Sequence, residues 1–75
     1  MADYAVVLFA STAHALRAEK VLTQAGVPIK LIPTPRQFST DCGLALRFEA
    51  AAAERVEAAL AEQGAPFRGI HPLGL

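Results

Sequence analysis

Two hydrophobic patterns alternate along the chain, one typical of strands and the other of helices. An apolar run rich in β-branched residues over 4–10 (YAVVLFA) predicts a central strand buried on both faces. Over 13–25 the apolar residues recur at the spacing of an amphipathic helix. Its expected buried face consists of Ala15, Ala18, Val21, Leu22 and Ala25. Ser11 or Thr12 is expected to cap this helix, because a side-chain oxygen can accept from a free amide of the first turn.

The second half of the chain echoes the first. The segment QAGVP ends the first helix, and EQGAP ends a second helix expected at 50–63. Gly26 is expected to adopt the left-handed conformation that follows a helix, and Gly64 to cap the second helix. The buried face of that helix is expected to consist of Ala52, Val56, Ala59 and Leu60.

Three further short strands complete the pattern. They are expected at 29–32, 44–48 and 67–71, with a loop over 37–43. Pro33 and Pro35 are expected to end the first of these strands, because proline cannot donate to a sheet ladder.

The order strand–helix–strand, repeated twice, determines the expected fold class. It predicts a single α+β domain over residues 1–75, with a ferredoxin-like βαββαβ sandwich. In that fold a four-stranded antiparallel sheet carries both helices on one face. A swapped or thioredoxin-like fragment is the alternative.

Composition and charge restrict the class of protein. The chain is 53% hydrophobic and 19% charged, as globular domains are. Seven basic and seven acidic residues give zero formal net charge, which argues against a nucleic-acid-binding face and against attraction to membranes. A net charge near zero favours self-association, such as a homodimer. The first apolar run follows Asp3 and is too short for a membrane span or a signal peptide, so we expect a cytoplasmic protein.

The single cysteine, Cys42, lies in a connection bounded by prolines and Gly43. In the expected topology this connection and the turn over 11–14 lie at the same end of the domain. A helix N-terminus stabilises a nearby thiolate. Arg36 and His14 would add positive charge, and a positive φ at Gly43 would present amides beside the sulfur.

These considerations give a set of candidate site residues. Cys42 is the candidate reactive residue, and the candidate binding residues are Ser11, Thr12, His14, Arg36 and Gly43. The neighbouring Asp41 opposes thiolate formation, so the direction of the net pKa shift stays open at this stage.

A structural role is the alternative for each of these residues. Cys42 can be a small, partly buried side chain, and Ser11 and Thr12 can be caps alone. Arg47, with apolar neighbours, is expected to point away from the helices. The scattered Cys42, His14 and His71 do not have the spacing of a zinc site, so no metal is expected. No phosphate loop, dinucleotide motif, Ser-His-Asp signature or CxxC pair is present, and we expect neither a cofactor nor a hydrolase.

Three sequence motifs resemble those of a known family. The runs STAHALRAEKVL, LIPTPR and CGLALRF are similar to a small bacterial family of uncharacterised selenium/sulfur (Se/S) carrier-like proteins, over nearly the whole chain. Besides Cys42, the matched positions are Ser11, Thr12, Glu19, Pro33, Pro35, Arg36, Gly43 and Arg47. Thr40 and Asp41 depart from the small neutral residues expected before the cysteine.

The resemblance implies a carrier that holds a persulfide or a selenide on Cys42. Its partners would be sulfur or selenium donor and acceptor proteins, and it would be a carrier or binding protein rather than a stand-alone enzyme. The alternatives are a regulatory module that binds a small anion or an amino acid, and a non-catalytic interaction domain. Fold class alone does not distinguish them.

Overall fold

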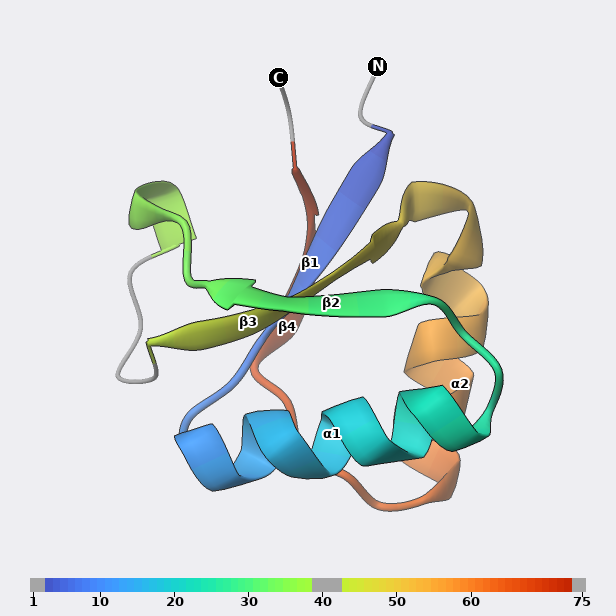
Figure 1. Ribbon diagram of the computed structural model, residues 1–75. Helices are drawn as coiled ribbons and strands as arrows, with labels where there is room; N and C mark the ends of the chain where they lie inside the picture. The colour runs from blue at the N-terminus through green and yellow to red at the C-terminus, as the bar shows by residue number, and fades with distance from the viewer. Residues whose placement is uncertain (1–2, 39–42, 74–75) are drawn as a thin grey trace.

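Two strand–helix–strand units share one sheet (Figure 1). The first unit consists of β1 (Tyr4–Leu8), α1 (Thr12–Gln24) and β2 (Ile29–Pro33). The second consists of β3 (Leu44–Glu49), α2 (Ala53–Glu62) and β4 (Gly69–Leu73). Two short 3-10 helices, η1 (Arg36–Phe38) and η2 (Ala50–Ala52), follow β2 and β3. The computed structural model describes residues 3–38 and 43–73, and all structural statements refer to these ranges.

The strands form one sheet in the order β2-β3-β1-β4, and every pair of neighbours is antiparallel. The register pairs Leu8 with Ala45 and Tyr4 with Glu49, and these pairs mark the two ends of the central strands. Both helices contribute to the hydrophobic cluster on one side of the sheet. The predicted ferredoxin-like α+β fold is therefore confirmed.

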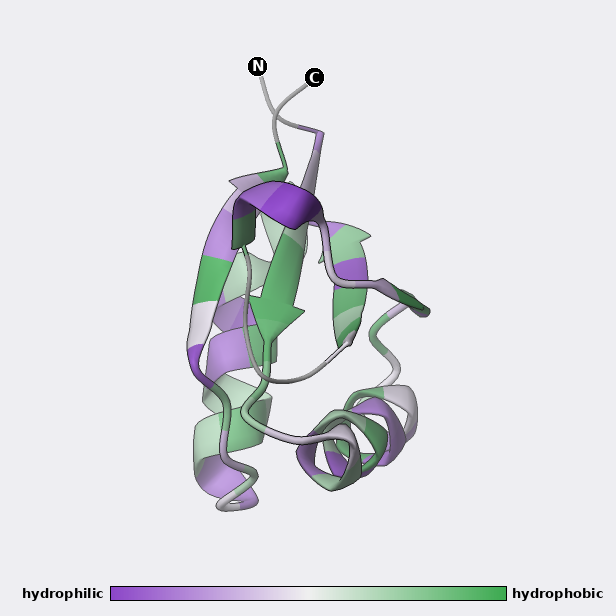
Figure 2. Ribbon diagram, turned by 90° about the vertical axis from the view of Figure 1, so that its left-hand side faces the viewer, coloured by the Kyte–Doolittle hydropathy of each residue, from purple (hydrophilic) through white to green (hydrophobic). Residues whose placement is uncertain are grey.

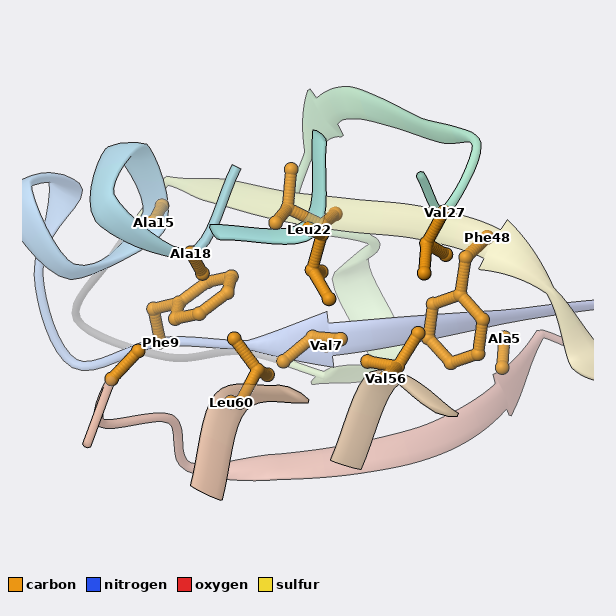
Figure 3. Packing of buried hydrophobic residues seen from close by; sticks show 12 residues of the cluster. Ala5, Val7, Phe9, Ala15, Ala18, Leu22, Val27, Phe48, Val56 and Leu60 are labelled. Atoms are coloured by element: carbon orange, nitrogen blue, oxygen red, sulfur yellow. The ribbon is translucent and has the colours of Figure 1, made fainter. Parts of the chain in front are cut away.

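The main core lies between the sheet and the helices. Figure 3 shows Leu22 of α1 and Leu60 of α2 directed toward Val7 of β1 and toward Phe9, which directly follows this strand. All four side chains are fully buried. The small Ala15 and Ala18 of α1 are also fully buried against this cluster. The helix periodicity read from the sequence thus identifies the helical residues of this core, and the strands and connections supply the others.

The predicted residues at the helix ends are confirmed, but the burial of one residue and the start of the second helix differ from the prediction. Ser11 caps α1, and Gly26 and Gly64 have φ angles of 78° and 63°. Ala25 is the C-cap residue and is exposed, so its predicted burial is wrong. The second helix begins as the 3-10 turn η2, and its α-helical part starts only at Ala53.

The strand ends show where prolines are tolerated. Pro33 is the last residue of β2 and Pro72 lies inside β4, although the sequence predicted that Pro33 would end the strand before it and that the last strand would cover 67–71. Both strands are edges of the sheet, where one row of amides needs no partner strand. The missing N–H of proline therefore costs little at these positions.

A second, smaller cluster lies on the face of the sheet opposite the helices, here called the outer face. Val6, Leu8 and Ala45 are buried there, and Phe38 of η1 packs against them. Figure 2 shows hydrophobic colour on the central strands and mixed colour along both helices. Because Phe38 belongs to the connection after β2, this connection covers part of the outer face. Among the described residues, no helix has the length and apolar character needed to cross a membrane.

Candidate functional site

The turn that begins α1 and the start of β3 lie at the same end of the sheet. The register pairs the last residue of β1, Leu8, with Ala45, and the last residue of β2, Pro33, with Leu44. The amide of Thr34 donates to the carbonyl of Gly43 at 3.0 Å. Figure 1 shows α1 beginning near the start of β3. For the described residues, the prediction that the two connections lie at the same end of the domain is confirmed.

Ser11 performs the capping role that its type predicts. Its backbone is extended, and its hydroxyl oxygen accepts from the amide of His14 at 3.2 Å. Thr12 is exposed in the first turn, and His14 is half-buried one residue before the buried Ala15. The first turn contains no acidic residue, so no carboxylate there offsets the partial positive charge of the helix N-terminus.

Arg36 is exposed at the start of η1. This short helix turns toward the outer face, because the ring of Phe38 stacks on the imidazole of His71 with centroids 5.0 Å apart. Within the described residues, no hydrogen bond or ring contact joins Arg36 to the Ser11 turn. The structure therefore shows no hydrogen bond between the described Arg36 and the first turn of α1.

The expected backbone conformation of Gly43 is wrong. In the described part of the chain, positive φ angles occur at Gly26 and Gly64 and not at Gly43. Gly43 leads directly into the extended β3, and its carbonyl continues the pairing with the β2 side through Thr34. Gly43 therefore does not use the left-handed conformation that the sequence predicted for it.

Cys42, the candidate reactive residue, lies outside the described residues, as do Thr40 and Asp41. Its role therefore stays a prediction. In the described ranges, no group of three or more histidine, cysteine, aspartate or glutamate side chains could hold a metal ion.

Sequence reasoning missed the contact between Phe38 and His71. A Cβ atom built at Gly69 would lie 3.0 Å from His71 Nε2, so the imidazole occupies space that a side chain at residue 69 would take. Phe38 then stacks on that imidazole. The glycine two residues before His71 on the same face of β4 was the available signal, since alternate strand residues share a face.

Arg47 points away from the helices, as predicted. Its guanidinium carbon lies 4.6 Å from the centre of the Tyr4 ring, a cation–π contact on the outer face. Arg47 thus belongs to the end of the sheet opposite the Ser11 turn, because Tyr4 begins β1 and Ser11 follows its end.

Comparison with known proteins gives one family. A search of curated proteins and a search of solved structures find no match to the chain. The family model described as "Putative Se/S carrier protein-like" matches residues 3–72, which is nearly the whole chain and covers both strand–helix–strand units except for the last residue of β4. The chain therefore belongs to the Se/S carrier protein-like family.

Proposed function

We propose that the chain carries a sulfur or selenium atom on Cys42, bound as a persulfide or a selenenylsulfide. The observation that carries this proposal is the family match over residues 3–72, because that range contains Cys42, the single thiol of the sequence. A carrier with one cysteine has no second thiol that could discharge its cargo within the chain.

The transfer is an exchange at sulfur. The Cys42 thiolate attacks the outer sulfur of a donor persulfide, a bond forms between Sγ and that sulfur, and the donor S–S bond breaks. The donor thiolate leaves with the bonding electron pair, and the proton of the persulfide stays with the transferred atom. No net oxidation takes place. An acceptor protein then removes the atom by the same exchange, and a selenium atom follows the same balance.

The position of α1 supports this chemistry. Its first turn, with Ser11, Thr12 and His14, lies at the end of the sheet to which Gly43 belongs. A helix N-terminus carries roughly half a positive charge, which favours a nearby anion such as a thiolate or a terminal persulfide. In the proposal Arg36 adds a positive charge from the connection after β2.

The test compares Cys42 with the same thiol at another position of the chain. The reduced protein is incubated with glutathione persulfide, and intact mass is followed over time. We expect a gain of one sulfur atom at least tenfold faster than in a Cys42→Ser/Gln37→Cys double variant, whose thiol lies on exposed η1. The urea-unfolded wild-type chain gives the rate of an unassisted thiol.

Equal rates in the wild type, the double variant and the unfolded chain would contradict the proposal. A binding module, the rival function, predicts in addition that Cys42→Ser retains ligand binding. The carrier predicts that this variant accepts no sulfur.

A further inference from the structure

The outer face of the sheet has a hollow at the end opposite the Ser11 turn. It has a volume of about 140 Å³, and its polar or charged lining residues are Tyr4, Lys30, Arg47 and Glu49. The remaining lining residues are the apolar Pro28, Ile29 and Phe48. The strand register pairs Lys30 with Arg47 and Tyr4 with Glu49. Alternation along the strands directs these four side chains away from the helices, because Val6, Ala45 and Ile32 share their parity and form the outer cluster.

The stability of the fold does not explain the two cations of this hollow. Like charges directly opposite each other on neighbouring strands destabilise the pair. In the part of the chain that the structure describes, neither Lys30 nor Arg47 forms an ion pair. Arg47 is half-buried, and the Tyr4 ring lies 4.6 Å from its guanidinium carbon. The contact with the Tyr4 ring restrains the guanidinium before any ligand binds, which lowers the entropy that binding would cost.

An acid lines the same hollow. Glu49 is exposed, and it too forms no ion pair within the described ranges. The hollow thus presents two cations and one carboxylate that do not neutralise one another directly. A ligand that carries both charges on neighbouring atoms can bridge these groups, whereas a simple anion would be repelled by Glu49.

We propose that this hollow binds a free α-amino acid with a small side chain. The ligand carboxylate accepts hydrogen bonds from Lys30 and Arg47, and the ligand ammonium donates to Glu49. The volume of about 140 Å³ leaves room for a small molecule, since one water needs roughly 10–15 Å³ on the same measure. This inference is independent of the proposed carrier function, because none of its residues lies at the Ser11 end.

The test is an NMR titration of the full ¹⁵N-labelled chain with L-alanine at constant ionic strength. Propionate lacks the ammonium group and ethylamine lacks the carboxylate, so they serve as matched probes. We expect saturable amide shifts at Tyr4, Lys30, Arg47 and Glu49 with L-alanine. Both analogues should bind at least tenfold more weakly.

Variants separate the two halves of the site. Glu49→Gln should weaken L-alanine binding at least fivefold and strengthen propionate binding, because it removes the carboxylate that repels a simple anion. Arg47→Gln should weaken the binding of both. Glu54→Gln, which removes an exposed acid on α2, is the control and should change neither. The absence of saturable shifts with L-alanine, or equal affinity for propionate and L-alanine, would overturn the proposal even if a variant failed to fold.

Discussion

Glycines that look alike in the sequence have different roles in the backbone. Gly26 follows α1 with a φ of 78°, and its amide donates to the carbonyl of Thr23. Gly43 leads into β3 without a positive φ, and a Cβ atom at either glycine would meet no atom within 4 Å. The backbone conformation alone therefore distinguishes the two positions.

Substitution of these glycines by alanine tests that distinction. We expect Gly26→Ala to lower the free energy of unfolding by about 1 kcal/mol, because a left-handed backbone strains an L-residue. Gly43→Ala should change it by less than about 0.5 kcal/mol or raise it slightly, since alanine reduces the entropy of the unfolded chain. Urea denaturation measures both. A larger loss for Gly43→Ala than for Gly26→Ala would contradict this account.

At the scale of elements, the described part of the connection between β2 and β3 is attached to the sheet both at its base and through η1. The Thr34 amide bonds to Gly43 at its base, and the Phe38 ring stacks on His71 of β4. The second contact joins η1 to the opposite edge of the sheet, since β2 and β4 are the two edge strands. One side chain thus ties this connection to the outer face.

A double-mutant cycle measures the strength of that attachment. Phe38→Ala, His71→Ala and the double variant are compared with the wild type by urea denaturation. Stacked ring pairs contribute about 0.5–1.5 kcal/mol beyond buried area, so we expect a coupling free energy of that size. Strict additivity of the two single variants would show that the rings do not stabilise each other.

For the whole molecule, the question is how a chain of 75 residues secures a core. A chain of this length buries about 60% of its unfolded surface, and its free energy of unfolding is on the order of 5 kcal/mol. The structure places buried clusters on both faces of the sheet, so β1 is covered on each side. The second cluster adds burial that the two helices alone do not provide.

Two leucines on α1 test the dependence on the main core. Leu22 is fully buried and Leu16 is 48% exposed. We expect Leu22→Ala to lower the free energy of unfolding by about 2–5 kcal/mol, which is enough to unfold much of the protein at 25 °C. Leu16→Ala should change it by less than about 0.5 kcal/mol. Thermal and urea denaturation followed by circular dichroism would reveal the difference, and comparable losses would contradict the assigned burial.

The sequence by itself determined the elements and their order. Hydrophobic period, the Ser11 cap and the glycines after the helices act locally, so they predicted the strand–helix–strand repeat, the main core and the shared end of the two connections. The family motifs lie within the same local runs. Contacts between residues that lie far apart in the sequence had no such local signal.

Tertiary structure decided that Pro33 and Pro72 lie within strands, at the two edges of the sheet. It also decided the contact of Phe38 with His71 and the hollow around Arg47, since strand register brings these distant residues together. The absence of a positive φ at Gly43 and the exposure of Ala25 likewise became clear only from the tertiary structure. Local propensity sets what a segment forms, while register and packing set what it touches.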